Sequence, residues 1–369
     1  FYFIIIFVNH SFKKNIHTTR IIYTLSMKYQ FFTNSEKTWG SMYNSITQAQ
    51  ESIYLEMYIF EDTVEKYPFF DLLKKRASDG IRVKLILDAF GSMELSNNRI
   101  AELIASWAEV LFQSYFLHRA HRKILVIDER IGYIGGVNFH QTARLWDDLV
   151  VRVESRLVSN IVKSFAKSYR DARWKDTALL NIKNKISLNK VNAWIVEHSP
   201  FQNLFSLKKL YLEHINAAQE RIILVTPYFL PKRWLSGALH QAVLRGIKVE
   251  ILIPKHTDYP LINHVNYYYM YRLTQLWIRF YLEPQMNHAK AMIIDTDIGL
   301  VGSQNLDFLS FEFNSEVGVF FRDAAVVGEL AKITEQWKSG STLFESAIYK
   351  PRWFDSILSF CIRLFSRIF

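Results

Sequence analysis

The stretch that decides the fold is His121-Arg-Lys123-Ile-Leu-Val-Ile-Asp128, which is followed by Gly135-Gly136-Val-Asn138. A second copy reads His288-Ala-Lys290-Ala-Met-Ile-Ile-Asp295 and is followed by Gly302-Ser303-Gln-Asn305. His, Lys, Asp and Asn all recur at one offset of 167 positions (288 − 121, 290 − 123, 295 − 128 and 305 − 138). Four chemically distinctive residues at one offset indicate an internal duplication. The sequence therefore predicts two similar halves that share one active site.

The apolar run before each Asp predicts a strand that is buried on both faces. Side chains at positions i and i+2 of a strand lie on the same side, roughly 7 Å apart. The His and Lys of each copy should therefore project together from the start of the strand. The Asp lies at odd spacing and should point the other way, so we expect Asp128 and Asp295 to be structural anchors rather than reacting groups.

A histidine taken alone is usually an ordinary surface or core residue, but two matched His-x-Lys pairs favour a phosphate site. Lys supplies positive charge, and His can act as a nucleophile or a general acid near neutral pH. The Gly-rich turn that precedes Asn138 and Asn305 lets the backbone come close to a ligand or a neighbouring strand. Each Asn amide is therefore expected near the His and Lys side chains.

The HxKxxxxD motif with a trailing G-G/S-x-N, present twice, resembles the phospholipase D superfamily. The resemblance extends from about Lys28 to about Lys338. It implies two duplicated α/β domains that pack with pseudo-two-fold symmetry around one active site. In that superfamily the His of the N-terminal half is usually the nucleophile, which implies His121 as the nucleophile and His288 as the general acid and base. The symmetry of the sequence by itself leaves this assignment open.

The expected chemistry is a two-step phosphoryl transfer. One His attacks a phosphodiester and forms a covalent phosphohistidine, while the other protonates the leaving alcohol and then deprotonates the incoming one. Positive charge and hydrogen bonds for the phosphate are expected from Lys123, Lys290, Asn138, Asn305 and Ser303. Because two lysines and two asparagine amides can stabilise the charge on the phosphate, neither a metal ion nor a cofactor is expected.

A nucleophilic His needs a carboxylate at its other ring nitrogen, which fixes the tautomer. The candidates are Asp148 and Glu316, which follow His121 and His288 by 27 and 28 positions (148 − 121 and 316 − 288). They occupy matching places in the repeat, and the resemblance supports a functional role for both. An ordinary salt bridge is the alternative for each of them.

The rest of each half also repeats. Ile46-Thr-Gln-Ala-Gln-Glu-Ser-Ile resembles Ile215-Asn-Ala-Ala-Gln-Glu-Arg-Ile, and Gly80-Ile-Arg-Val-Lys resembles Gly246-Ile-Lys-Val-Glu. Strands and helices alternate, which predicts a mixed, largely parallel sheet with helices on its faces. Helices are expected at 39–50, 69–78 and about 98–108, and strands at 52–60, 81–87, about 122–128 and 131–136. The expected domains are 27–190 and 191–345, flanked by an uncertain extension, 1–26, and a C-terminal helix, 346–369.

The two ends of the chain raise the question of membrane contact. The apolar run at 1–8 is too short to span a bilayer, and a signal peptide fits poorly. We interpret 1–26 as a fragment or a mis-assigned start before Met27, with a short membrane anchor as the alternative. Residues 353–369 have the pattern of a basic amphipathic helix with aromatic residues, which suits a membrane interface, although packing against the protein's own core would produce a similar pattern.

Composition sets further limits on the class of protein. The chain has 369 residues, of which 50% are hydrophobic and 22% charged, so a globular core is expected. The one cysteine, Cys361, excludes an internal disulfide and a metal site built from several thiolates. The net charge of +10 suits anionic partners, either nucleic acid or anionic lipid, although a basic surface can also serve only solubility.

Several further stretches resemble bacterial cardiolipin synthases, among them Glu56-Met-Tyr58-Ile-Phe60, Thr226-Pro227-Tyr228-Phe229 and Asn305-Leu-Asp307-x-x-Ser310-x-x-x-Asn314-x-Glu316. The two N-terminal transmembrane helices of many members are not found in this sequence. Gly136, Ala120 and Asp147 also stand where other branches or relatives carry Ser, Asn and Arg.

The resemblance implies transfer of a phosphatidyl group between two phosphatidylglycerol molecules with release of glycerol. It also implies peripheral binding at the cytoplasmic face of the bacterial membrane, and one duplicated chain should suffice as a catalytic monomer. The alternatives are a phospholipid hydrolase, a nuclease of the same superfamily and a non-catalytic lipid-binding scaffold. No recognisable DNA-binding module is found in the sequence, which disfavours nucleic acid.

Overall fold

The structure is a computed structural model that describes residues 28–62, 64–113, 118–173 and 192–347, together with 349, 351, 353 and 355. The extension 1–26 and most of the expected C-terminal helix at 346–369 lie outside the described residues. The fold that follows is therefore that of the two repeats.

The first repeat begins with a strand and a helix and then alternates between strands and helices. Its elements are β1 (Lys28–Asn34), α1 (Ser35–Gln48), β2 (Ser52–Met57), α2 (Phe69–Ser78), β3 (Arg82–Asp88), α3 (Asn97–Ala105), β4 (Glu109–Gln113), β5 (Ile124–Ile127), β6 (Ile131–Gly135), the short 3-10 helix η1 (Gln141–Ala143), β7 (Asp147–Glu154) and α4 (Leu157–Arg173).

The second repeat follows the same order, with a few short additions. Its elements are β8 (Ala193–His198), η4 (Pro200–Gln202), α5 (Ser206–Ala217), β9 (Arg221–Val225), β10 (Phe229–Leu230), α6 (Arg233–Leu244), β11 (Lys248–Pro254), α7 (Pro260–Thr274), β12 (Arg279–Glu283), β13 (Ala291–Ile294), β14 (Ile298–Gly302), β15 (Leu306–Asp307), α8 (Phe308–Glu312), β16 (Glu316–Phe321), α9 (Ala324–Ser339) and β17 (Thr342–Leu343).

Local signals explain where several helices begin and end. The side chain of Asn34 accepts hydrogen bonds from the backbone N–H groups of Glu36 and Lys37, so α1 begins at Ser35, before the predicted start at position 39. Helix α2 covers the predicted range and is followed by Gly80, whose φ of 87° is readily adopted only by glycine. Gly246 repeats this conformation after α6, with a φ of 86°.

Each repeat forms one mixed sheet, as predicted, but the sheets are not largely parallel. The strand orders are β1-β7-β6-β5-β2-β3-β4 and β17-β12-β11-β9-β13-β14-β16-β8. Parallel pairing within these two sheets is confined to β2, β3 and β4 and to β9, β11 and β12, and their other described neighbours pair antiparallel. The reason lies in the connections, because the turn between β5 and β6 is too short for a crossover and makes a hairpin.

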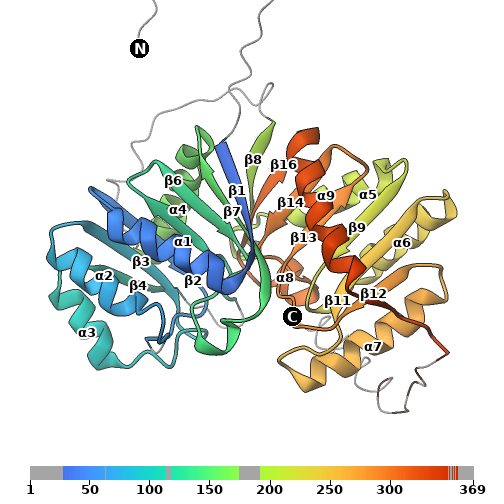
Figure 1. Ribbon diagram of the computed structural model, residues 1–369, viewed down its shortest axis with the longest axis horizontal. Helices are drawn as coiled ribbons and strands as arrows, with labels where there is room; N and C mark the ends of the chain where they lie inside the picture. The colour runs from blue at the N-terminus through green and yellow to red at the C-terminus, as the bar shows by residue number, and fades with distance from the viewer. Residues whose placement is uncertain are drawn as a thin grey trace, which may run out of the picture.

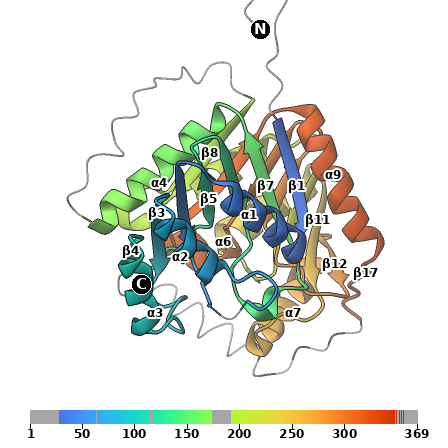
Figure 2. The same cartoon turned by 60° about the vertical axis from the view of Figure 1, so that its left-hand side comes forward.

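The two repeats lie side by side, with their sheets facing one another across the centre of the molecule (Figure 1). Helices α1, α2 and α3 cover the outer face of the first sheet, and α5, α6 and α7 cover the outer face of the second. Figure 2 shows α1 and α2 lying across the first sheet. A central apolar cluster joins the inner faces and includes Phe165 of α4, Leu330 of α9, and Val126 and Ile293 from the two motif strands. The repeats therefore share a core.

The pairing of the strands places each motif at the corresponding end of its own sheet. Glu56, near the end of β2, lies opposite Ile124, the first residue of β5, and the second repeat matches this with Val225 opposite Ala291. The carboxyl ends of the parallel strands therefore lie beside the residues that precede β5 and β13, which is where open α/β sheets commonly bind ligands. Within the described part of the chain, the helices are too short or too polar to cross a bilayer.

Candidate active site

The two His-x-Lys pairs lie just before the motif strands, in the chain that enters β5 and β13. All four side chains are buried. The ammonium group of Lys123 donates a hydrogen bond to the carbonyl oxygen of His121 over 2.8 Å, and Lys290 donates in the same way to the carbonyl oxygen of His288. Each Lys is thereby held beside its own His. The strand predicted from about position 122 would have included Lys123, but β5 begins at Ile124.

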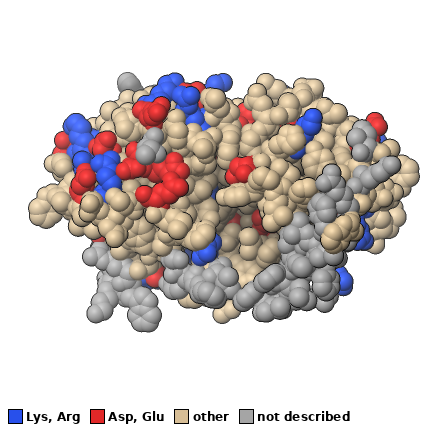
Figure 3. Space-filling view, turned by 90° about the horizontal axis from the view of Figure 1, so that it is seen from below, with Lys and Arg blue, Asp and Glu red and all other residues tan. Residues whose placement is uncertain are grey.

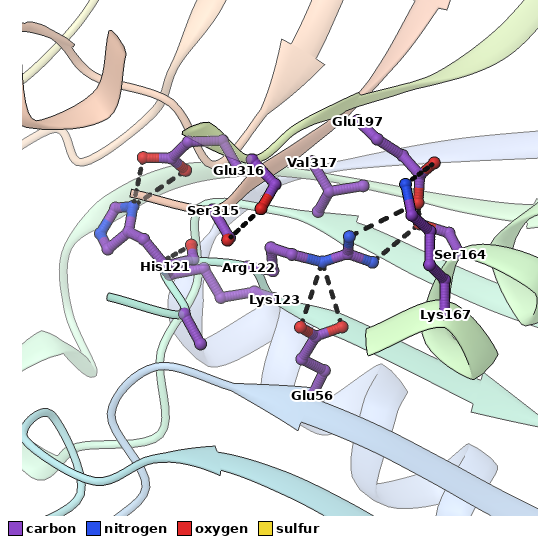
Figure 4. A network of polar contacts seen from close by, with 12 residues as sticks. Glu56, His121, Arg122, Lys123, Ser164, Lys167, Glu197, Ser315, Glu316 and Val317 are labelled. Carbon is purple, nitrogen blue, oxygen red and sulfur yellow. Dashed lines mark hydrogen bonds and ion pairs between the residues drawn. The ribbon is translucent and has the colours of Figure 1, made fainter. Parts of the chain in front are cut away.

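Each imidazole is hydrogen-bonded to a carboxylate from the other repeat. The Nδ1 atom of His121 lies 3.0 Å from both carboxylate oxygens of Glu316, as Figure 4 shows. The Nδ1 atom of His288 lies 2.9 Å from Oδ2 of Asp148. In sequence each carboxylate follows the His of its own repeat, yet in the structure it contacts the other one. A complete site therefore needs both repeats.

This pairing fixes the tautomer of both imidazoles. A carboxylate accepts but cannot donate when it is ionised, so the proton of each ring belongs on Nδ1. The Nε2 atom of each ring then carries a lone pair and is available as a nucleophile or a base.

The two carboxylates are held in different ways. Glu316 accepts a hydrogen bond from the hydroxyl of Ser303, which itself accepts from the backbone N–H of Val317 over 3.1 Å. Asp148 instead lies against Gly136, where an added Cβ would meet its Oδ1 at 2.1 Å. The fully buried hydroxyl of Ser303 is thus engaged in holding Glu316, and the phosphate contact expected of Ser303 stays a prediction.

Burial dominates the proton affinities of the site. It lowers the pKa of His288 to about 3, with the charge of Lys290 acting in the same direction. Burial also lowers the pKa of His121, against the opposing effect of Glu316. Both imidazoles are therefore neutral in the free protein near pH 7.

The two lysines respond to the same environment. Burial lowers the pKa of Lys123 to about 7, with Glu316 opposing the shift, and that of Lys290 to about 8, with Asp148 opposing it. Lys290 also contributes to the shift of Lys123 and of His121, so the two half-sites lie within electrostatic range of one another. Two buried ammonium groups close together form a site that gains from binding an anion.

The two asparagines lie at the same edge and are buried. Asn138 accepts at Oδ1 from the backbone N–H of Ile59 over 3.3 Å, and its carbonyl oxygen accepts from the indole of Trp39 over 3.0 Å. The backbone N–H of Asn305 donates to the hydroxyl of Ser310 over 3.0 Å, while its Oδ1 is buried without a partner among the described residues. The side-chain amide of Asn305 is therefore not used up by the fold.

Asp128 and Asp295 lie at the far end of the motif strands from the imidazoles. Asp128 accepts hydrogen bonds from the backbone N–H groups of Gln50, Glu51 and Ser52. Asp295 accepts from the matching positions of the second repeat, Gln219, Glu220 and Arg221. Both therefore bind the turn before β2 or β9 to the end of the motif strand.

Two tyrosines that received no role from the sequence contact the imidazoles. The ring of Tyr58 packs edge-on against His121 with centroids 4.7 Å apart, and Lys123 Nζ lies 4.9 Å from the centre of the same ring. Tyr228 packs against His288 with centroids 6.2 Å apart. Their offset of 170 positions (228 − 58) is close to that of the motif, so a search for repeated aromatic residues would have found them.

The His288 side carries two further rings. Trp146 lies 5.7 Å from His288 and 5.3 Å from His140, measured between ring centroids. Burial lowers the pKa of His140 to about 4, and Lys123 adds to this shift. His140 lies two residues after Asn138, and Asp307 occupies the matching position of the second repeat, so the motif offset (307 − 140) does not reveal it as a repeated residue.

In the part of the chain that the structure describes, no group of three or more His, Cys, Asp or Glu side chains could hold a metal ion.

The duplicated α/β fold with paired His-x-Lys sites defines the chain as a phospholipase D-like enzyme. A family model described as "Cardiolipin synthase, PLD-like domain" matches residues 42–171 and 211–337, which together make up more than half of the chain. The chain belongs to this family, as the sequence motifs predicted.

Individual relatives agree with this assignment. A cardiolipin synthase of Oceanobacillus iheyensis is 30% identical over 349 residues, covering 90% of this chain and 73% of the relative. The minor cardiolipin synthase ClsB of Bacillus subtilis is 29% identical, covering 86% of this chain and 85% of the relative. Among solved structures, phosphatidylserine synthase of Haemophilus influenzae superposes with a TM-score of 0.72 over 92% of this chain and 93% of that one, at 13% identity. That likeness establishes the fold.

Proposed function

We propose that this protein is a phosphatidyltransferase that makes cardiolipin from two phosphatidylglycerol molecules and releases glycerol. The observation that carries the proposal is the crossed pairing, in which two neutral imidazoles, each oriented by a carboxylate of the other repeat, flank two buried lysines. The family to which the chain belongs supports the choice of lipid substrate.

In the first step, Nε2 of His121 attacks the phosphorus of phosphatidylglycerol. A P–N bond forms, the P–O bond to the glycerol headgroup breaks, and His288 gives a proton to the departing oxygen. Glu316 stabilises the positive charge that develops on His121. Lys123, Lys290 and the asparagine amides stabilise the negative charge on the non-bridging oxygens of the phosphate.

In the second step, a hydroxyl of another phosphatidylglycerol takes the place of the glycerol. His288 now accepts the proton of this hydroxyl, its oxygen attacks phosphorus, and the P–N bond breaks. Free His121 and cardiolipin result. If water took that place instead, the product would be phosphatidic acid.

The low pKa of His288 in the free protein does not conflict with its role as a general acid. A bound phosphodiester brings a negative charge next to a group whose pKa has been lowered to about 3 by burial and by Lys290. The anion favours the protonated imidazole and screens it from both lysines. The substrate therefore makes His288 a better proton donor than it is in the empty site.

Exposed apolar residues that are close to site residues in sequence or in space support binding to a membrane surface. Phe90, Leu145 and Tyr259 are 53%, 63% and 56% exposed. Tyr259 packs on Tyr228, the ring that contacts His288, with centroids 6.1 Å apart. Figure 3 shows the molecule from below, with broad uncharged areas over the second repeat. This apolar rim would let a lipid headgroup enter the site while its acyl chains stay in the bilayer.

One chain contributes both imidazoles and both carboxylates, so we also propose that the catalytic unit is a monomer. A peripheral position on the cytoplasmic face of the bacterial membrane is part of the same proposal.

The test is to incubate the purified protein with phosphatidylglycerol vesicles and to follow the lipids and the glycerol by mass spectrometry. We expect cardiolipin and glycerol to appear in equal amounts, and both to be lost in the His121→Ala and His288→Ala variants. Phosphatidic acid without cardiolipin would overturn the proposal in favour of a hydrolase.

A further inference from the structure

Arg122 lies between His121 and Lys123 in sequence, but its side chain has different surroundings. It is 4% exposed. Its guanidinium lies 3.1 Å from the carboxylate of Glu56 on β2, and one of its nitrogens donates to the hydroxyl of Ser164 on α4 over 2.7 Å. Figure 4 shows the guanidinium pointing away from His121 and toward these two partners. The residue therefore belongs to the support behind the site and does not face the phosphate.

The third partner of Arg122 comes from the second repeat. Its guanidinium lies 3.6 Å from Oε1 of Glu197 on β8, and Ser164 donates to the same carboxylate oxygen over 2.6 Å. Lys167 lies 3.7 Å from the other oxygen. Arg122 thus links the entry to β5 with the edge strand of the second sheet (Figure 4).

Strand β8 is also the neighbour of the strand that carries Glu316. Glu197 lies opposite Val317 in the β8–β16 pairing, and His198 lies opposite Glu316. The motif entry is therefore joined to the β8–β16 pair in two places, once on each strand. On one side the imidazole of His121 contacts Glu316, and on the other Arg122 reaches Glu197, one residue along in the register.

The second repeat has no counterpart of this charged cluster. The positions that match Arg122 and Glu56 are Ala289 and Val225 (289 − 122 = 167 and 225 − 56 = 169). Both are buried in the central apolar cluster. The same fold is therefore built with small apolar residues at these positions.

Burying charges carries an energetic cost that an apolar replacement avoids. Burial raises the pKa of Glu56 despite the charge of Arg122. Burial also opposes the ionisation of Glu197, but Arg122, Ser164 and Lys167 together outweigh it through charge and hydrogen bonds, and the pKa of Glu197 lies below its usual value. Replacing a buried ion cluster by packed apolar residues is often neutral or stabilising. A role in stability alone therefore does not explain why the first repeat has the cluster and the second does not.

We propose that Arg122 is a positioning residue that fixes His121 against Glu316 across the junction of the two repeats. By holding the entry to β5 on β8, it keeps Nδ1 of His121 in contact with the carboxylate and Nε2 aimed at the phosphorus. The absence of this cluster from the second repeat fits the different duty of His288, which only transfers protons and tolerates a looser position. This inference rests on the proposed function.

The experiment uses phosphatidyl-p-nitrophenol, whose p-nitrophenolate leaves without needing a proton from His288. The pre-steady-state burst of p-nitrophenolate then reports on attack by His121. We expect Arg122→Met to lower the burst rate about 10- to 100-fold, because small displacements of a reacting group have effects of this size. The KM should change far less than the burst rate.

The pH profile separates positioning from mere structural support. Glu316 raises the pKa of His121 against the effect of burial. If Arg122→Met loosens their contact, the pKa of His121 falls further, and the acidic limb of the burst rate moves to lower pH. A change that acted only on folding would leave this limb where it is.

Two further variants keep the test decisive. Glu197→Gln preserves size and removes the charge that Arg122 contacts. Like Arg122→Met, it should lower the burst rate and move the acidic limb to lower pH, and it serves as the test if Arg122→Met folds poorly. The matched control is Lys338→Met, which breaks a 3.1 Å ion pair with the buried Glu250. Lys338→Met should lower the melting temperature and leave the burst rate and the limb unchanged.

Native burst rates and an unmoved limb in both Arg122→Met and Glu197→Gln would overturn the inference. Absence of phosphatidyl transfer to His121 would look different, because the unmodified protein would then release no p-nitrophenolate at all. A hydrolase would still show the burst, so that outcome of the lipid assay leaves the role of Arg122 intact.

Discussion

The two half-sites have the same plan and differ in how each is held. Glu316, the longer carboxylate, is held by the hydroxyl of Ser303, whereas Asp148, which is one methylene shorter, packs directly on Gly136. Each carboxylate is thus matched to the residue beside it. The two half-sites therefore share their reacting groups and differ in the matched pair formed by each carboxylate and the residue that holds it.

A second difference lies behind the imidazoles. The first half-site is backed by the charged cluster of Arg122, Glu56 and Glu197, and the second is backed by Ala289 and Val225. Since the reacting groups themselves are alike, this unequal support is what distinguishes a fixed His121 from a less constrained His288. Substitutions in each half-site can test that distinction.

Removing each imidazole should separate the two roles. We expect His121→Ala to abolish product formation with any leaving group, because the nucleophile is lost. His288→Ala should slow cardiolipin formation by about 10²- to 10⁴-fold, the usual range for general acid–base catalysis. With phosphatidyl-p-nitrophenol, the burst rate of His288→Ala should be close to that of the unmodified protein. Equal bursts from both variants would contradict the unequal roles.

Neutralising the carboxylates tests the crossed pairing. Glu316→Gln should impair the step that His121 performs, and Asp148→Asn the step that His288 performs, each by about 10²- to 10⁴-fold on phosphatidylglycerol, because a misoriented imidazole holds the wrong tautomer. The p-nitrophenolate burst distinguishes them, since only Glu316→Gln should lower it. A burst lost in Asp148→Asn and kept in Glu316→Gln would mean that each carboxylate serves the His of its own repeat.

We expect substrate binding to weaken at alkaline pH, because Lys123 and Lys290 lose their positive charge. Their pKa values in the free protein are lowered to about 7 and about 8, so their charge is lost as the pH rises through this window. We expect kcat/KM to fall by about tenfold per pH unit for each proton lost. The kcat should fall only at higher pH, because bound phosphate favours the charged lysines. A kcat/KM that stays level up to pH 10 would contradict this account.

The smallest effect on catalysis is expected at the two motif aspartates. Asp128→Ala and Asp295→Ala should each lower the free energy of unfolding by about 1–2 kcal/mol, since backbone N–H groups lose their acceptor. Activity per folded molecule should stay close to native. Urea unfolding and a titration of active sites measure the two quantities separately.

The pH dependence of that stability has a definite sign. Burial alone would raise the pKa of Asp128, but the hydrogen bonds from Ser52, Gln50 and Glu51 outweigh it and hold the pKa below its usual value. The contribution of Asp128 is therefore fully present above the unfolded pKa of about 4 and is lost as the pH falls through the lower folded value. In Asp128→Ala the difference from native should vanish in acid.

Much of this arrangement follows from the sequence. The shared offset of 167 positions was sufficient to predict two repeats and one site, and the period of the strand placed Asp128 away from His121. Helix α2 was found at the predicted residues because a Gly follows it.

Other features depend on contacts that no local pattern encodes. The crossed pairing of His121 with Glu316 depends on how the two sheets dock, and 195 residues separate the partners. The contact of Ser303 with Glu316 depends on how the chain between β14 and β16 folds, and no sequence pattern indicated it. The expectation of a largely parallel sheet failed because the motif strands form hairpins. The C-terminal amphipathic helix lies mostly outside the described residues and stays a prediction.

One site is built across two unequal halves, and we propose His121 as its nucleophile. The most direct test is to mix the His288→Ala variant with phosphatidyl-p-nitrophenol, denature it at alkaline pH and locate the phosphatidyl adduct by mass spectrometry of its peptides. The account predicts an adduct on His121 that disappears in a His121→Ala, His288→Ala double variant. In a parallel sample of unmodified protein, an adduct on His288 with His121 unlabelled would contradict the account.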